Sequence, residues 1–367
     1  MFRVTKLKNT KIIRTFPANS LLIVAFISLS FSLGHAEGKK DDIVINLDIS
    51  SMKAIVLDPA KVLENVDEFW KTDGAYILSN KWHTSSNYPK DMERWGEKLT
   101  SLASMTLEER QNLPYFKIAL QVEEKKNLFY SKAVPHIKSF LPDTERVSFE
   151  STVYVTAFTT AYSFAMDGQM VIDVASGYYR NDINFVLSEL THELFHVGYG
   201  QISNDFQEDP LEDETKYSYL SQLQNEEIAT YVDYKIQDVF PGSDPDHVMM
   251  DKPDVVKEKI AAVNEIFSQP DSADLSQREQ MSWDVGVMAR AYYVTGAHMA
   301  RTIDQNLGRA ALVDTLYIGP LNFVDVYNEL VPKEEQILRF PGPNPDSLLL
   351  RLKADVLSKD DSAVEKL

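Results

Sequence analysis

Hydrophobic and polar residues follow two different patterns in the first part of the chain. Residues 43–47 (Ile-Val-Ile-Asn-Leu) are mostly apolar and predict one short strand. From about residue 58 to 142, apolar residues recur at intervals of three to four, as in Val62–Val66 and Phe116–Leu120. That spacing is typical of helices with one buried face, so we expect a helical N-terminal region.

The pattern changes near residue 146. Residues 146–160 are rich in β-branched and aromatic side chains, and a second such run covers residues 170–174. The second run follows Asp167-Gly168, a pair typical of turns. We interpret the two runs as adjacent antiparallel strands.

From residue 181 onward the pattern is helical almost to the end, including a long helix over Trp283–Ile303. Acidic loops are expected near residues 203–215 and 241–254. The predicted fold class is therefore α+β and mostly helical, with a small antiparallel sheet. The length of 367 residues suits one large domain or two modest ones. We place a helical region at 37–145 and the region that carries the chemistry at 146–367.

The first 36 residues differ from the rest. Five basic residues and no acidic residue precede the apolar run Leu21–Leu33, and Gly34-His35-Ala36 fits a small-x-Ala cleavage site. This order predicts a signal peptide over residues 1–36 and export to a periplasm or the medium. The alternative is an uncleaved membrane anchor, although the run is short for a bilayer span of about 20 residues. After cleavage we expect no stable membrane insertion.

The chain is strongly acidic, with 37 basic and 55 acidic residues and a formal net charge of −18. This charge repels nucleic acid and anionic lipid, so we expect neither as a partner. The chain has no cysteine, so it forms no disulfides. Any metal site must therefore use His, Asp and Glu side chains.

Residues 191–196 read Thr-His-Glu-Leu-Phe-His and contain the pattern H-E-x-x-H. On a helix, His192 and His196 lie on one face and can bind one ion. Catalytic zinc binds imidazole nitrogens and keeps one position for a water, whose pKa it lowers. Glu193 lies about 100° further round the helix. Its carboxylate is therefore placed to take the proton of that water as a general base.

The residues around this motif predict a helix with one buried side. Asn181 or Asp182 can cap its start, and Gly198 and Gly200 can end it. The two histidines lie away from an apolar stripe, so we expect them to face a cleft. The stripe consists of Ile183, Leu187, Leu190, Leu194 and Val197.

A catalytic zinc site needs a third protein ligand. A histidine six residues after His196 is excluded, because that position is Ile202. The other common solution is a glutamate on a following helix. Glu226 and Glu227 lie at the start of the amphipathic stretch 225–234, and from the residues alone either side chain can point inward.

These motifs resemble the gluzincin group of zinc peptidases. H-E-L-F-H is followed thirty residues later by N-E-E-I-A-T-Y, and the second motif of the group is a glutamate, often after asparagine, before small and apolar residues. The match covers roughly residues 146–330 and is also similar to uncharacterised families of exported bacterial zinc-dependent peptidases. The resemblance implies a zincin-like catalytic domain with Glu226 as the third ligand. Glu227 stands where many relatives have glycine, which leaves the choice between the two glutamates open.

Ligating imidazoles need outer partners that orient them. Asp233 lies seven residues after Glu226 on the same helical face, and Glu189 lies one turn before His192. Both are candidates for that role. The alternative for each is an ordinary acidic residue on a solvated helix surface.

Amide hydrolysis builds negative charge on the carbonyl oxygen, so a further donor is expected. Tyr293-Val294-Thr295-Gly296 resembles a Tyr-x-x-Gly element of similar exported families. Tyr293 is therefore the first candidate and His298 the second. In gluzincin-like folds the strand before the metal helix is a sheet edge that binds an extended peptide, which implies this role for residues 169–174. The alternative is an ordinary inner strand.

The predicted function is hydrolysis of peptide bonds in a peptide or protein substrate by a zinc-activated water. His192, His196 and Glu226 hold the Zn²⁺, and Glu193 is the base. A hydrolase of a non-peptide amide or ester would use the same residues. A protein of a different class, an exported metal-binding protein without catalysis, would need four protein ligands and would give Glu193 no purpose.

Overall fold

The strands form one four-stranded sheet in the order β1-β2-β4-β3. The computed structural model describes residues 43–77, 88–142, 147–159, 163–203, 214–242, 244–270 and 273–338. The predicted leader, residues 1–36, and most of the predicted acidic loop 203–215 lie outside these ranges. The strands are β1 (Val44–Asp48), β2 (Glu150–Thr156), β3 (Ser163–Met166) and β4 (Gln169–Asp173).

The sheet is mixed, and the expectation of an antiparallel pair was wrong for β2 and β4. These strands are neighbours but run parallel, with Val153 opposite Met170. The reason is β3, a short strand between them in the chain that the sequence pattern did not reveal. Asp167 and Gly168 both have positive φ (52° and 73°) and form the tight turn that pairs β3 with β4 antiparallel. The chain therefore reverses twice between β2 and β4.

The position of β4 in the sheet also differs from the expected edge. β4 pairs with β2 on one side and with β3 on the other, so it is an inner strand. Its backbone groups are used within the sheet, and Met170–Asp173 are buried. The prediction of a substrate-binding edge at residues 169–174 was wrong, and the edge position belongs to β3.

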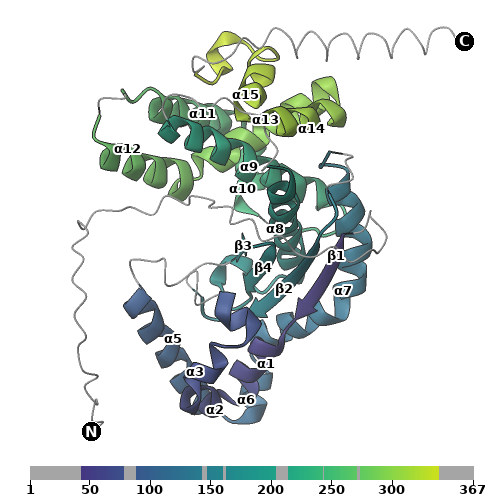
Figure 1. The fold of residues 1–367 in the computed structure, drawn as a ribbon, viewed down its shortest axis with the longest axis vertical. Helices are drawn as coiled ribbons and strands as arrows, with labels where there is room; N and C mark the ends of the chain where they lie inside the picture. The colour runs from purple at the N-terminus through teal and green to yellow at the C-terminus, as the bar shows by residue number, and fades with distance from the viewer. Residues whose placement is uncertain are drawn as a thin grey trace, which may run out of the picture.

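The helices before β2 pack beside the sheet and at one end of the molecule. Figure 1 shows α1 to α6 at the lower end and the long α7 alongside β1. Because β1 pairs parallel with β2, the predicted regions 37–145 and 146–367 share one sheet and one hydrophobic core. The helices are α1 (Ser50–Leu57), α2 (Pro59–Glu64), α3 (Val66–Phe69), α5 (Tyr88–Ala103), α6 (Leu107–Gln111) and α7 (Pro114–Lys138).

The helices after β4 begin beside the sheet and gather toward the upper end of the molecule (Figure 1). This region contains most of the C-terminal half of the described chain, and the fold is α+β and mostly helical, as predicted. Its elements are η1 (Gly177–Tyr179), α8 (Ile183–Ser203), α9 (Glu214–Ile236), α10 (Pro245–Met250), α11 (Pro253–Phe267), α12 (Leu275–Met281), the π-helix η2 (Ser282–Met288), α13 (Ala291–Leu307), α14 (Arg309–Ile318), α15 (Pro320–Asn328) and η3 (Lys333–Glu335).

Helix α8 carries the H-E-x-x-H motif through the centre of the molecule. It begins as predicted, because the Asp182 carboxylate accepts a hydrogen bond from the Asn184 N–H (2.9 Å). It does not end at Gly198 or Gly200, which both lie inside the helix. The prediction that only one side of this helix is buried was also wrong. The sheet, α7 and α9 cover α8, which is buried on nearly every face.

Two expectations for the C-terminal helices were wrong. The predicted helix Trp283–Ile303 is broken, because Arg290 adopts a left-handed conformation (φ 62°) between η2 and α13. Residues 241–254 are not one loop, because they contain α10 and the start of α11. Pro245 and Pro253 occupy the first turns of these helices, where a missing N–H costs little.

Gly296 allows α13 to approach α9 closely. A Cβ at this position would lie 2.3 Å from the Glu227 Cβ and 2.6 Å from the Leu223 carbonyl oxygen. We expect Gly296→Ala to lower the free energy of unfolding by about 1–3 kcal/mol, because the contact with the Leu223 backbone cannot be relieved by a side-chain rotation. The measurement is urea unfolding. Gly200→Ala on α8 is the control, because a Cβ there meets nothing within 4 Å and is expected to stabilise the helix by roughly 0.5–1 kcal/mol.

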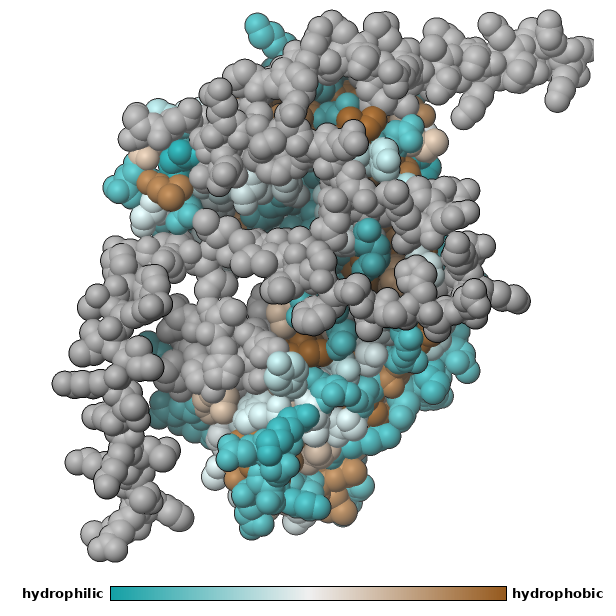
Figure 2. Space-filling view, in the orientation of Figure 1, coloured by the Kyte–Doolittle hydropathy of each residue, from teal (hydrophilic) through white to brown (hydrophobic). Residues whose placement is uncertain are grey.

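The surface in Figure 2 is largely hydrophilic at the end formed by the early helices, with hydrophobic residues scattered among polar ones. Isolated exposed hydrophobic residues are normal on a folded protein. Within the described ranges, every helix is too short or too polar to cross a bilayer.

Candidate metal centre

The two histidines of the motif converge as the helical spacing predicts. His192 and His196 lie one turn apart on α8, and their Nε2 atoms are 3.0 Å apart. Both rings are largely buried, with side-chain exposures of 10% and 9%. Glu193, between them in the chain, is also buried.

Glu226 of α9 brings a carboxylate to the same place. Its Oε2 lies 3.4 Å from the His196 Nε2 and 3.8 Å from the His192 Nε2. A tetrahedral zinc ion with bonds of about 2.0–2.1 Å separates its ligand atoms by about 3.3 Å. The three atoms therefore fit one zinc ion. The Glu226 side chain is 28% exposed, so the centre opens toward solvent on that side.

Glu227 points into the protein. Its side chain is completely buried against Gly296 of α13, and neither carboxylate oxygen has a hydrogen-bond partner among the described residues. Burial raises the pKa of Glu227 well above its usual range, and the charge of Glu226 raises it further. Of the two glutamates, Glu226 is the one that faces the imidazoles.

Asn225 orients the second imidazole. The His196 Nδ1–H donates to the Asn225 Oδ1 at 3.0 Å, which leaves the Nε2 lone pair directed at the cluster. No role was predicted for Asn225, although the second gluzincin motif often has an asparagine before the glutamate. The contact is available because Asn225 and Glu226 are consecutive at the same turn of α9.

Asn225→Ala is expected to weaken zinc binding by about 10–100-fold, because the imidazole loses the partner that selects its tautomer and ring orientation. The measurement is competition with a chromogenic zinc chelator. Asn225→Asp keeps the acceptor oxygen and should bind zinc as tightly as the original chain or more tightly. Equal loss in both variants would contradict this role.

The two predicted outer carboxylates have other partners. The Asp233 Oδ1 accepts a hydrogen bond from the His247 Nε2–H at 2.6 Å, and Glu189 accepts one from the Ser163 hydroxyl. Both carboxylates are buried, so the alternative of a solvated helix surface was wrong. Their influence on His192 is through charge, which is felt over a longer range than a hydrogen bond.

Electrostatics favour a cation at this centre. Burial lowers the pKa of His192, but the contact with Glu226 and the charges of Glu189 and Asp233 outweigh it and raise the pKa to about 10. Burial raises the pKa of Glu226, but the charge of His196 and the contacts with both imidazoles hold it well below the usual range. Zinc would replace the imidazole protons at the same carboxylate, so its binding releases protons and weakens as the pH falls.

The two predicted oxyanion donors lie in different surroundings. The Tyr293 ring packs under the Arg290 guanidinium, whose central carbon is 3.1 Å from the ring centroid. His298 lies between α13 and α15, with its Nδ1 3.5 Å from an Arg301 nitrogen and its ring edge-on to Tyr327. Burial and the Arg301 charge lower the pKa of His298 to about 4. Neither contact residue of His298 belongs to α8 or α9.

The fold and the site together define the class of protein. It is a mostly helical α+β protein in which α8 supplies two imidazoles and α9 supplies one carboxylate to a single candidate metal centre. A family described as "Putative zinc dependent peptidase (DUF5700)" matches residues 80–336, more than half of the chain. The chain belongs to this family. The match includes residues 80–145 of the predicted N-terminal helical region. No curated protein and no solved structure matches the chain significantly.

Proposed function

We propose that the protein is a zinc peptidase of the gluzincin type, with His192, His196 and Glu226 as ligands and Glu193 as general base. The convergence of the three ligand atoms, 3.0–3.8 Å apart, carries this proposal. The family to which the chain belongs supports both the metal and the class of reaction.

Each residue then has a distinct task. Zinc held by these three residues would supply a Lewis acid that polarises the substrate carbonyl and lowers the pKa of a water. Glu193 would take a proton from the attacking water and pass it to the leaving amine. Glu193 directly follows His192 on α8 and is buried, so its side chain has little freedom to move.

Because β4 is an inner strand, we propose β3 as the strand that binds an extended peptide. β3 is the last strand in the order of the described sheet, and the Ser163 hydroxyl at its start donates to the Glu189 carboxylate on α8. An extended substrate could add to this edge through backbone hydrogen bonds, one helix turn from the motif. Tyr293 remains the preferred oxyanion donor, because Arg290 fixes its ring at the start of α13.

The test is digestion of a peptide library by the purified protein, with Glu193→Gln as the matched inactive protein. Cleavage that requires both Glu193 and zinc supports the proposal. Activity confined to small amides or esters would instead show the same chemistry on a non-peptide bond. Bound zinc without hydrolysis of any substrate would favour a metal-binding protein without catalysis.

Export rests on the predicted leader at residues 1–36. We propose that the leader is removed after Ala36. N-terminal sequencing of the protein expressed with its leader in a bacterium, from periplasm and membrane fractions, tests this. A new N-terminus near residue 37 is expected, and an intact leader in the membrane fraction would indicate an anchor.

A further inference from the structure

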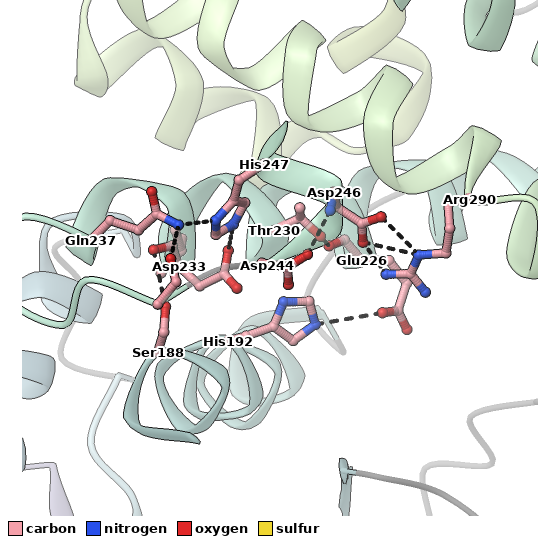
Figure 3. A network of polar contacts seen from close by, with 12 residues as sticks. Ser188, His192, Glu226, Thr230, Asp233, Gln237, Asp244, Asp246, His247 and Arg290 are labelled. Carbon is pink, nitrogen blue, oxygen red and sulfur yellow. Dashed lines mark hydrogen bonds and ion pairs between the residues drawn. The ribbon is translucent and has the colours of Figure 1, made fainter. Parts of the chain in front are cut away.

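A second group of buried metal-ligand side chains lies next to the first. Asp233 near the end of α9, Asp244 just before α10 and His247 in the first turn of α10 each place one ligand atom within 4.8 Å of the other two. Their exposures are 1%, 5% and 3%, so the cluster is closed to solvent. Figure 3 shows the three side chains converging above α8, on the far side of His192 from Glu226.

The three side chains are already held by outer contacts. The Gln237 amide donates to the His247 Nδ1 and also to the Gly242 carbonyl oxygen. The Asp244 Oδ2 accepts a hydrogen bond from the Tyr178 hydroxyl (3.1 Å), and its Oδ1 accepts one from the Asp246 N–H (2.6 Å). Each carboxylate oxygen has a second lone pair, so these bonds leave Asp244 able to bind an ion.

The charges around the cluster are compatible with a cation. Four buried carboxylates act on one another here: Glu189, Asp233, Asp244 and Asp246. Arg290 pairs with Asp246 (Nε to Oδ2, 2.9 Å). The His192 and His247 imidazoles act on the other carboxylates. A divalent ion at the cluster would take over the balance that the His247 proton provides.

We propose that Asp233, Asp244 and His247 form a second zinc site. One imidazole and two carboxylates are ordinary zinc ligands, and each of these residues supplies one ligand atom to the cluster. In the metal-free protein the His247 Nε2–H donates to Asp233 at 2.6 Å. Zinc takes the place of that proton, which is released to solvent, and the two atoms separate to about 3.3 Å. The ion would tie α10 to α9 and so support the helix that carries Glu226.

The experiment counts zinc sites in the metal-free full-length protein by titration against a competing chelator. The original chain is expected to bind two equivalents. A variant with His192→Ala and His196→Ala should retain one equivalent, and zinc should still raise its melting temperature, by about 5 °C at a free concentration of about 100 times Kd. His247→Gln should also bind one equivalent. The readout is metal content, so the result does not depend on peptidase activity.

Asp244→Asn is a second probe in case His247→Gln fails to fold, and it should bind one equivalent. Asp254→Asn, an exposed position on α11 with the same charge change, should bind two. A single equivalent in the original chain that disappears in the His192→Ala/His196→Ala variant would overturn the second site and leave the first intact. Persistence of two equivalents in His247→Gln or Asp244→Asn would overturn it as well.

Discussion

Glu193→Gln is expected to lower kcat for peptide cleavage by about 10³-fold while the protein keeps its zinc, because general-base catalysis contributes roughly 10²–10⁴-fold. Glutamine has the shape of glutamate but cannot accept a proton from water. Glu193 lies on α8 between the two histidines and is buried, so an isosteric change leaves the surrounding packing in place. The measurements are kcat on the best library peptide and zinc content by mass spectrometry.

Glu258→Gln is the matched control for this experiment. Its side chain is on α11 and is 72% exposed, so the same change there should leave kcat and zinc content unaltered. A Glu193→Gln protein as active as the original would show that Glu193 is not the base and that the hydrolase mechanism is wrong. Loss of zinc together with activity would mean that the Glu193 side chain is needed for metal binding. The experiment would then give no evidence that Glu193 is the base.

Glu226→Gln should release zinc, whereas Glu227→Gln should retain it. The Glu226 carboxylate faces both imidazoles at 3.4 and 3.8 Å, and an amide is a much poorer ligand than a carboxylate. We expect the loss of affinity to exceed the roughly 10–100-fold that an outer partner contributes. Glu227 is buried against Gly296 with its pKa raised, so a neutral side chain of the same shape suits its place.

The paired glutamates provide their own control, since the two variants make the same chemical change at consecutive positions. Zinc affinity is measured with the competing chelator, and thermal unfolding of each metal-free variant checks that the fold is kept. The reverse result, with zinc lost in Glu227→Gln and kept in Glu226→Gln, would require α9 to rotate by about 100° and would refute the present assignment.

The motif on α8 was predictable because it depends on local geometry alone. Residues four apart on a helix share a face whatever the helix packs against, so His192 and His196 had to converge once α8 formed. The Asp182 cap and the presence of strands at β1, β2 and β4 were predictable for the same reason, since capping and strand propensity act over a few residues. The number and direction of the strand pairs were not local properties.

Tertiary structure decided the features that depend on residues far apart in the chain. The choice of Glu226 over Glu227 follows from the rotation of α9 against α13, which Gly296 sets by its missing side chain. The pairing of Asp233 with His247 depends on where α10 packs, and residues 241–254 showed only an acidic, loop-like composition.

The sequence by itself determined the chemistry of this protein: a helix with two imidazoles and a carboxylate, and a glutamate thirty residues later. The structure decided which strand lies last in the described sheet, which acid meets the histidines and which buried groups surround them. Periodicity shows which face of an element is apolar, but a buried polar contact depends on the relative positions of two elements, which only their packing sets.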